Sequence, residues 1–454
     1  MKKSFKNLSP PQILVLGFLS LIMIGAVLLS LPFASVDGKP LDIVDALFTS
    51  TSAVCVTGLV VLDTGTHFTL FGQIVIITLI QCGGLGFMTI ASLVFLMIGK
   101  RITLKERMLL KEALNEFSIS SVVRLVRMVI IVAFSIEIIG ALFFSIRFIP
   151  QFGVSKGIYY AIFHSISAFC NAGFDLMGGF NSFIAYVDDG LVNIVMITLI
   201  TLGGLGFVVL SDIYRKTLNW NRYRLRLHTK IVLIASLSLL IIGFAVYFPL
   251  ELNNPETLGK LSTKGKIWGG IFQSVTPRTA GLSTIDQSNL TYGSKFLTMI
   301  MMYIGASPAG TGGGVKTTTA FVIFLLIKSV VQGHDDVTFM KKRIDQGTIM
   351  RAVTLLFGGL FLVILVALSL IIIESGNGGV MTFENIMFEA FSAFGTVGLG
   401  TGITPYLTQA SRIILIFAMF AGRVGLMTVM YAIANRMIKH HSRIRYTKEN
   451  IMIG

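Results

Sequence analysis

Residues 163–174 read Phe-His-Ser-Ile-Ser-Ala-Phe-Cys-Asn-Ala-Gly-Phe. The same pattern, a phenylalanine followed nine or ten residues later by a glycine with small and hydroxyl-bearing residues between them, recurs at 48–59, 272–282 and 388–399. The glycines of the four copies, which we call the glycine quartet, are Gly58, Gly173, Gly281 and Gly398. They are spaced 108 to 117 residues apart, which indicates four tandem copies of one unit with a period far longer than that of solenoid repeats.

The composition places the chain in a membrane. Of its 454 residues, 54% are hydrophobic and 13% are charged, whereas about 25% of the residues of a soluble domain are charged. A soluble globular enzyme and a disordered chain are both excluded. Apolar stretches long enough to cross about 30 Å of hydrocarbon lie at 12–34, 69–98, 127–148, 190–211, 230–250, 296–327, 350–373 and 411–434. The first of them is expected to be a retained helix rather than a cleaved signal peptide.

The charged residues predict the orientation of these eight crossings. Both chain ends fall on one side, together with three basic loops, and the positive-inside rule assigns that side to the cytoplasm. The basic residues of this side include Lys2, Lys3, Lys6, Lys100, Arg101, Lys105, Arg107, Arg215, Lys216, Arg222, Lys341, Lys342, Arg343, Arg436, Lys439 and Arg443. We interpret this surface as a determinant of topology that attracts anionic membrane lipids, and not as a nucleic-acid site. Docking of a cytosolic regulator is the second interpretation.

Each repeat is expected to contain a crossing, a short re-entrant helix, a glycine loop and a second crossing. We place the repeats at 1–105, 106–222, 223–335 and 336–454. A second recurring motif supports this division. It reads Gly83-Gly84-Leu85-Gly86-Phe87 in the first repeat, Gly203-Gly204-Leu205-Gly206-Phe207 in the second and, with less similarity, Gly422-Arg423-Val424-Gly425-Leu426 in the fourth. The predicted fold is an all-α membrane protein with eight transmembrane helices and four re-entrant pore loops around one pseudo-fourfold pore.

Four glycine loops at membrane depth predict a cation filter. Irregular backbone is tolerated there only where protein surrounds it or water fills a cavity. Short helices that end at the loops would direct their negative C-terminal ends at a central cavity, and loop carbonyls would replace the hydration shell of a monovalent ion such as K⁺. The alternative, that the glycines only permit close helix packing, suits one loop better than four. The expected filter residues are Val56, Thr57, Gly58, Leu59, Asn171, Ala172, Gly173, Phe174, Thr279, Ala280, Gly281, Leu282, Thr396, Val397, Gly398 and Leu399.

The sixth apolar stretch is expected to break in its middle. Pro308 and the five glycines between 305 and 314 oppose a continuous helix there. We expect two helical arms around a polar loop that gates the pore, with Gly310, Thr311, Gly312, Gly313, Gly314, Lys316 and Arg423 as its residues. The glycines and Lys316 resemble a phosphate-binding loop, but Val315 separates them and no strand precedes the loop, so ATP binding is not expected.

Several polar residues within the apolar stretches have two interpretations each. Arg423 either faces the pore and pairs with the gate loop or pairs with a buried carboxylate or backbone carbonyls. Glu137 is expected to form an interhelical hydrogen bond rather than act in transport. His164 is expected to be packed rather than a ligand, and Asn171 to add a polar edge to the filter. Arg278 either faces the outer vestibule or braces its loop.

These motifs resemble the Trk/Ktr/HKT superfamily of potassium transporters, and within it the membrane subunits of bacterial Ktr systems (KtrB). The resemblance covers nearly the whole chain. It implies a multi-pass bacterial cell-membrane protein, a homodimer with one pore per protomer, sodium-stimulated K⁺ uptake, and control by a cytosolic octameric ring of nucleotide-binding RCK subunits (KtrA). Relatives that pass mainly sodium often carry serine at the first filter glycine, whereas glycine at all four positions here favours potassium.

Two alternatives remain open from the sequence. A sodium-selective or poorly selective monovalent cation transporter of the same superfamily would share all of these motifs. An intramembrane enzyme is disfavoured, because Glu137, Lys316 and Arg423 form no catalytic cluster in the predicted spans. No cofactor is expected in this chain, in which potassium is the substrate and sodium an activating or coupled ion; channel-like passage and sodium-coupled symport both remain open.

Overall fold

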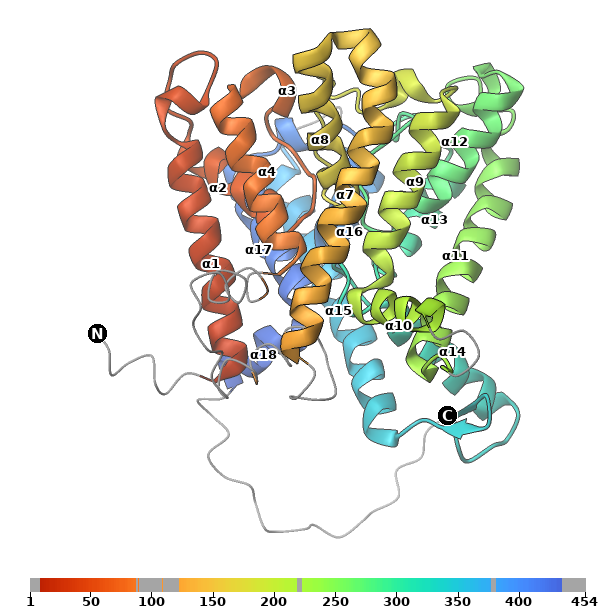
Figure 1. Ribbon diagram of the computed structural model, residues 1–454. Helices are drawn as coiled ribbons and strands as arrows, with labels where there is room; N and C mark the ends of the chain where they lie inside the picture. The colour runs from red at the N-terminus through yellow and green to blue at the C-terminus, as the bar shows by residue number, and fades with distance from the viewer. Residues whose placement is uncertain are drawn as a thin grey trace.

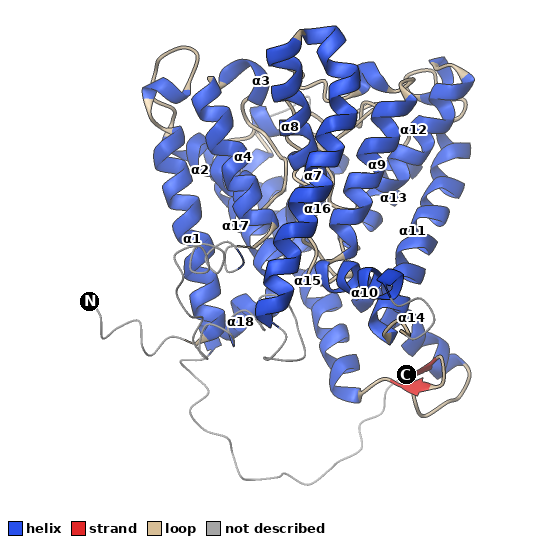
Figure 2. Ribbon diagram, in the orientation of Figure 1, coloured by secondary structure: helices blue, strands red, loops and turns tan. Residues whose placement is uncertain are grey.

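The computed structural model describes residues 9–86, 89, 108, 122–218, 223–376 and 381–434. Within these residues the protein is helical apart from one short hairpin, as Figure 2 shows, and the all-α prediction is confirmed. The basic chain ends and the basic loop at 100–111 lie outside the described residues. The described start and finish of the chain meet at one end of the molecule, where the side-chain amide of Gln12 donates to the carbonyl of Ala432 over 3.1 Å (Figure 1).

Four long helices form the outside of the molecule. They are α1 (Pro10–Leu29), α7 (Val122–Phe152), α11 (Leu227–Glu251) and α15 (Gln346–Glu374). Each is long and apolar enough to cross a membrane, yet only 28 to 33% of the residues in its most apolar window are buried. Exposed side chains such as Leu142 and Phe361 lie on these helices. Such surface is stable in lipid, because an α-helix satisfies its own backbone hydrogen bonds.

A short helix follows each long helix and packs against it. These re-entrant helices are α2 (Ile43–Val54), α8 (Val154–Cys170), α12 (Thr263–Val275) and α16 (Phe383–Gly395). Capping side chains fix three of their starts: Asp42 accepts from the amide of Val44 over 2.8 Å, and Ser262 and Thr382 accept in the same way. Each helix ends within the glycine motif of its repeat, three to six residues before the glycine.

The second helix of each repeat is shorter or interrupted. These helices are α4 (Leu70–Gly84), α9 (Gly190–Leu205) with α10 (Phe207–Leu218), α13 (Tyr292–Tyr303) with α14 (Thr317–Val331), and α17 (Gln409–Val424) with α18 (Leu426–Ala434). The predicted break in the sixth stretch is confirmed between Tyr303 and Thr317.

The crossings expected at 190–211 and 411–434 each consist of two helices, α9 with α10 and α17 with α18. The chain bends there by 102° and 98°, at Gly206 and Gly425, whose φ angles are +92° and +90°. Glycine adopts these angles without a Cβ penalty, so it ends one helix and lets the next leave in another direction. Gly86, at the equivalent place after α4, has a φ of +82°, and the rest of the stretch expected at 69–98, Thr89 apart, lies outside the described residues.

The four repeats close into a ring. Each second helix packs against the re-entrant helix of the next repeat: α4 against α8, α9 against α12, α13 against α16, and α17 back against α2. Figure 1 shows the re-entrant helices enclosed by the long helices, with α10 lying across one end of the molecule. The smaller elements are α3 (Thr64–His67), the 3₁₀ turns Pro32–Ala34, Ile184–Tyr186, Leu258–Lys260 and Thr404–Tyr406, and the antiparallel hairpin of β1 (Thr338–Phe339) and β2 (Lys342–Arg343).

Candidate functional site

The glycine quartet forms a closed ring at the centre of the molecule. A Cβ added to Gly58 would lie 2.8 Å from the Cα of Gly173, and one added to Gly173 would lie 3.1 Å from the Cα of Gly281. One added to Gly281 would lie 3.2 Å from the Cα of Gly398, and one added to Gly398 would lie 2.9 Å from the Cα of Gly58. Any side chain at these positions would collide with the neighbouring backbone, so the expected convergence of the four loops is observed.

Backbone conformation turns carbonyl oxygens toward this ring. All four glycines have positive φ angles, between +73° and +90°. The residues two places before them, Val56, Asn171, Thr279 and Thr396, are also left-handed, with φ between +49° and +71°. Each glycine also lies against the carbonyl oxygen of the residue before the next glycine, and these oxygens belong to Thr57, Ala172, Ala280 and Val397.

The residues around the ring are held rigidly. The side chains after the glycines, Leu59, Phe174, Leu282 and Leu399, are buried in the surrounding protein. The re-entrant helices end beside the ring, so their partially negative C-terminal ends lie near it. This arrangement favours a cation at the centre.

Four hydroxyl groups, which sequence reasoning did not single out, tie the filter strands to the re-entrant helices. Ser52 Oγ accepts from the amide of Gly58 over 3.1 Å, and Ser392 Oγ accepts from Gly398 over 3.1 Å. In the other two repeats Ser167 Oγ donates to the carbonyl of Phe174 over 2.6 Å, and Thr276 donates to that of Leu282. The signal was the hydroxyl residue at the same place in every copy of the motif.

The loop between α13 and α14, residues 304–316, lies directly against two of the strands that carry the glycine quartet. Its ends are joined by the amide of Gly305, which donates to the carbonyl of Val315 over 2.8 Å. The amide of Gly313 donates to Thr396 Oγ1 over 3.0 Å, and a Cβ at Gly312 would lie 2.8 Å from that of Thr279. The loop therefore contacts the left-handed residues of two filter strands.

The second repeat also holds this loop. The amides of Ser307 and Thr311 donate to the carbonyls of Gly204 and Gly203 over 3.0 and 3.2 Å. These carbonyls belong to the last turn of α9, where the helix break leaves them without a helical partner. The recurring glycine motif thus supplies acceptors, a role that its sequence did not reveal.

Arg423 connects three repeats. Its guanidinium donates to the carbonyl of Thr311 in the loop and to the carbonyls of Gly83 and Gly84 at the end of α4, the last over 3.3 Å. Arg423 therefore pairs with backbone carbonyls, one of which belongs to the loop, and its exposure to the pore stays a prediction. Lys316 Nζ donates to the carbonyls of Gly312 and Gly313 within the loop, over 2.8 and 3.3 Å.

The remaining polar residues have structural partners. The amide of Gln81 donates to both carboxylate oxygens of Glu137 over 3.0 Å, which confirms the interhelical hydrogen bond. Arg278 donates to Ser236 Oγ over 3.0 Å and is buried against α11, so it braces its loop and does not face an outer vestibule. His164 is fully buried among aromatic rings, as expected of a packed histidine.

Asp175 follows the second filter strand directly. Burial raises the pKa of its carboxyl to about 7, and the nearby Asp63 adds to this rise while the backbone amide of Met177 opposes it. Because the group lies in a loop outside the membrane spans, its charge near the filter depends on pH around neutrality.

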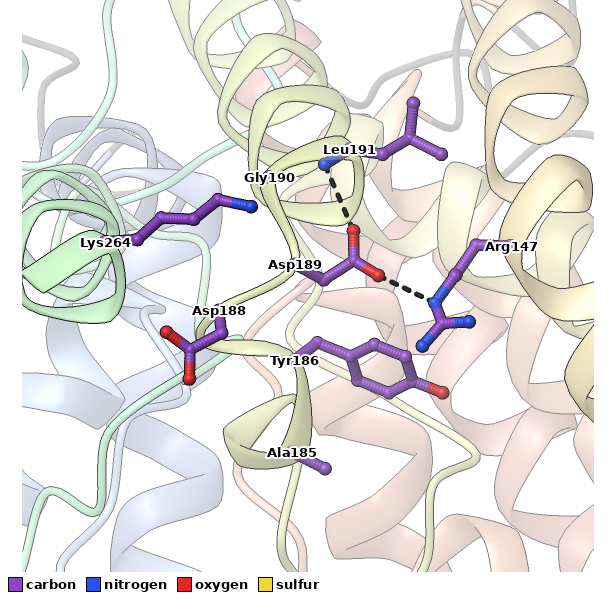
Figure 3. Close-up of a pocket in the computed structure, with 8 residues that line it drawn as sticks. All are labelled: Arg147, Ala185, Tyr186, Asp188, Asp189, Gly190, Leu191 and Lys264. Carbon is purple, nitrogen blue, oxygen red and sulfur yellow. Dashed lines mark hydrogen bonds and ion pairs between the residues drawn. The ribbon is translucent and has the colours of Figure 1, made fainter. Parts of the chain in front are cut away.

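A hollow of about 470 Å³ opens at the start of α9 (Figure 3). The carboxylate of Asp189 pairs there with the guanidinium of Arg147 over 2.7 Å, and Lys264 projects from α12 across the opening. The hollow adjoins the N-terminal end of α9, whereas the filter carbonyls lie at the C-terminal ends of the re-entrant helices. We therefore do not assign the hollow to the ion path.

Comparisons with known proteins agree with this geometry. The model of the TrkH family, described as a cation transport protein, matches residues 9–442. The Ktr system potassium uptake protein B of Bacillus subtilis is 44% identical over 447 residues, which cover 98% of this chain and 97% of that protein. The potassium/sodium uptake protein NtpJ of Enterococcus hirae is 41% identical over 456 residues, which cover 100% of this chain and 99% of that protein.

A solved structure shows the same fold. The potassium transporter TrkH from Vibrio parahaemolyticus has a TM-score of 0.68 at 18% sequence identity, over 91% of this chain and 84% of that chain. All of these relatives are transporters, which sets the enzyme alternative aside. Because the family model spans nearly the whole chain and two full-length relatives exceed 40% identity, this multi-pass membrane protein belongs to the TrkH family of cation transport proteins.

Proposed function

We propose that this chain is the ion-translocating membrane subunit of a Ktr-type potassium uptake system in the bacterial cell membrane. The observation that carries the proposal is the closed ring of Gly58, Gly173, Gly281 and Gly398 with its cycle of carbonyl oxygens. In this proposal a dehydrated K⁺ passes through the ring, and the carbonyls replace the water that it sheds. The four repeats keep the boundaries given above, and both termini lie in the cytoplasm.

The loop at 304–316 acts as the gate. It contacts two filter strands, and Arg423 and Lys316 place two positive charges beside it. Positive charge next to the filter opposes the passage of cations. Transport then requires the loop and Arg423 to move away from the ion path, which needs the loss of a few hydrogen bonds and no refolding of the long helices.

Regulation and assembly follow the Ktr pattern. Two proteins named as Ktr system potassium uptake protein B, from Bacillus subtilis and Vibrio alginolyticus, are 44% and 38% identical to this chain over 98% of its length. We infer a homodimer with one pore per protomer, stimulation by sodium, and control of the gate by a cytosolic ring of nucleotide-binding RCK subunits. The α14 helix, which begins where the loop ends, is the direct mechanical link to such a ring.

A sodium-selective or poorly selective transporter is the second candidate. The observation that favours it is the name of the Enterococcus hirae relative, a potassium/sodium uptake protein. Glycine at all four ring positions favours potassium, because every strand keeps the same backbone conformation.

Substitution of one ring glycine tests the proposal. Gly398→Ser places a Cβ 2.9 Å from the Cα of Gly58 at a φ of +90°, so the ring must distort. We expect K⁺ uptake by a transport-deficient cell that carries this chain and its regulator to fall by about tenfold or more, since steric strain of about 1.5 kcal/mol at the narrowest point suffices for this loss. Competition between K⁺ and Na⁺ in the same assay separates the two candidates.

The matched control is Gly376→Ser. A Cβ at Gly376 meets no atom within 4 Å, and its φ needs no glycine. Uptake should remain unchanged in this variant. If Gly398→Ser transports K⁺ with unaltered rate and selectivity, the ring is not the filter.

A further inference from the structure

A buried polar side chain follows the repeat phenylalanine in every re-entrant helix. These residues differ chemically although they occupy equivalent places, and each is at most 2% exposed: Thr49, His164, Gln273 and Glu389. None of them contributes to the ring of carbonyls. They lie on the re-entrant helices, next to the strands that carry the ring glycines, and their hydrogen-bond partners differ from repeat to repeat.

His164 holds the second strand beyond its glycine. The amide of Leu176, three residues after Gly173, donates to Nε2 of His164 over 3.0 Å. On the other side of the imidazole, Nδ1 lies 2.7 Å from the carbonyl oxygen of Tyr160 and must donate to it. These partners assign the neutral imidazole with its proton on Nδ1.

Glu389 lies beside the strand that leaves Gly398 in the fourth repeat. Thr404 Oγ1 donates to Oε1 over 3.1 Å, and a Cβ at Gly400 would lie 2.8 Å from the same oxygen. The carboxyl group is therefore pressed against the strand that leaves the ring.

The other two repeats hold their strands differently. Gln273 exchanges amide hydrogen bonds with Gln287, which reaches Ser283 Oγ over 3.0 Å and the carbonyl of Ile285 over 2.8 Å. The hydroxyl of Thr49 has no hydrogen-bond partner within the described residues. In the second and fourth repeats, this side chain thus holds the chain beyond the glycine directly, His164 through the amide of Leu176 and Glu389 through the hydroxyl of Thr404. The glycines of these two repeats lie across the ring from each other, because both adjoin Gly58 and Gly281.

We propose that Glu389 is a positioning residue that sets the preference for K⁺ over Na⁺ by fixing the outer part of the fourth filter strand, opposite the strand that His164 fixes. The inference rests on the proposed function of the glycine ring as a carbonyl filter. The spacing and rigidity of coordinating carbonyls decide how well they replace the water of a K⁺ or a Na⁺ ion. A group that locks a strand from behind therefore acts on selectivity without contacting the ion.

The test compares three variants of the full-length chain in liposomes. The readout is the ratio of K⁺ to Na⁺ uptake, with the inhibition of K⁺ uptake by Na⁺ as a second measure. Glu389→Ala should lower the ratio by about tenfold, the change expected when one hydrogen bond to a buried carboxyl is lost. Glu389→Gln should keep the ratio within about twofold, because its amide oxygen can still accept from Thr404. Thr404→Val, which removes the donor instead, should lower the ratio in the same direction as Glu389→Ala.

The matched control is Glu384→Gln. Glu384 lies in the first turn of the same helix and pairs with Lys295 Nζ over 2.9 Å, away from the strand beyond Gly398. Its substitution should leave the ratio unchanged. Elution and thermal unfolding of each purified variant report on folding.

The measured ratios of the variants either support or overturn the role of Glu389. An unchanged ratio in a folded Glu389→Ala protein overturns it, as does an equal loss in Glu389→Gln, which would show that the charge rather than the hydrogen-bond acceptor matters. If Glu389→Ala does not fold, an unchanged ratio in Thr404→Val overturns it. If Gly398→Ser lowers the ratio but Glu389→Ala does not, only this inference is refuted. If Gly398→Ser leaves the ratio unchanged, the proposed filter itself is refuted.

Discussion

Arg423 is stable in the interior of the protein because broken helices supply the acceptors that it needs. An unpaired charge at the centre of a membrane costs at least about 2.5 kcal/mol. Here the guanidinium donates to three carbonyls, two of which belong to the last turn of α4, where the regular helical hydrogen bonds end. At the scale of single residues, the site thus uses backbone carbonyls for two purposes, to line the ring and to hold the positive charge beside it.

Removal of this charge should speed transport. Arg423→Gln withdraws the guanidinium from Thr311 and from α4, so the loop loses a tether and the ion path loses a repulsive charge. We expect K⁺ uptake to rise by about tenfold, in line with the loss of one charged hydrogen bond of about 1.5 kcal/mol. Uptake of labelled Rb⁺ into liposomes measures this. A folded variant with an unchanged rate would assign Arg423 a purely structural role.

External pH should alter K⁺ affinity through Asp175. Since burial raises the pKa of its carboxyl to about 7, the group is neutral below that pH and ionised above it. A negative charge beside the second filter strand attracts cations, so the KM for K⁺ should fall by about two- to threefold as the external pH rises from 6 to 8.

Asp175→Asn should remove this part of the pH dependence and keep the higher KM throughout. Asp37→Asn, in an exposed loop, is the control and should preserve the pH response of the unmodified protein. A pH response that survives in Asp175→Asn would exclude this carboxyl as its source.

At the scale of secondary-structure elements, the second helices of the repeats share one feature. Three of them end at a glycine of positive φ, namely Gly86, Gly206 and Gly425. In the third repeat the corresponding interruption is longer and consists of the loop at 304–316. A helix that ends inside the protein leaves carbonyls free, and the loop uses those of α9 to stay in place. The proposed gate is therefore a longer break between two helices, and hydrogen bonds to the end of α9 hold it in place.

Shortening of this element should open the pore. Deletion of Gly310–Gly314 removes the bond from Gly313 to Thr396 and the bond from Thr311 to α9, while the arms α13 and α14 remain. We expect a higher basal K⁺ flux and a weaker dependence on the cytosolic regulator, both measured by uptake with and without that regulator. The preference for K⁺ should persist if the glycine ring alone selects the ion. An unchanged flux in a protein of normal thermal stability would show that the loop does not gate.

At the scale of the whole molecule, polar ties join each repeat to the next. The amide of Phe180 in the second repeat donates to Asp63 in the first over 2.9 Å, and Ser262 donates to Asp188 between the second and third. Lys295 pairs with Glu384 between the third and fourth over 2.9 Å, and Arg412 pairs with Asp45 between the fourth and first. This circle of contacts links the four repeats, and it includes a residue of α2, the capping residue of α12 and a residue of α16.

The tie that closes the circle should contribute measurably to stability. The side chains of Arg412 and Asp45 are 15% and 18% exposed, so Arg412→Gln should lower the midpoint of thermal unfolding, and the reversed pair Asp45→Arg with Arg412→Asp should recover most of the loss. A double-mutant coupling of about 1 kcal/mol is expected. Arg343→Gln, which breaks an ion pair that is 60% and 43% exposed, is the control. An equal effect of both substitutions would argue against a special role for the closing tie.

The sequence by itself determined the fold class, the fourfold repeat and the break in the sixth stretch. These features follow from local chemistry. Apolar length decides which segments cross the membrane, repetition shows in the motif itself, and Pro308 with its neighbouring glycines cannot continue a helix. The meeting of the four glycines was also predictable, because irregular backbone at membrane depth needs a shared polar environment.

Only the tertiary structure decided the partners across the repeats. Nothing in the sequence requires Gly206 and Gly425 to bend two further helices, since a glycine in a membrane helix is equally compatible with close packing. It also could not show that Arg423 reaches the carbonyls of Gly83 and Gly84, or that Glu389 braces the strand beyond Gly398. Such contacts join residues that are far apart in the chain, and they exist only once the ring has closed and brought helix ends from different repeats together.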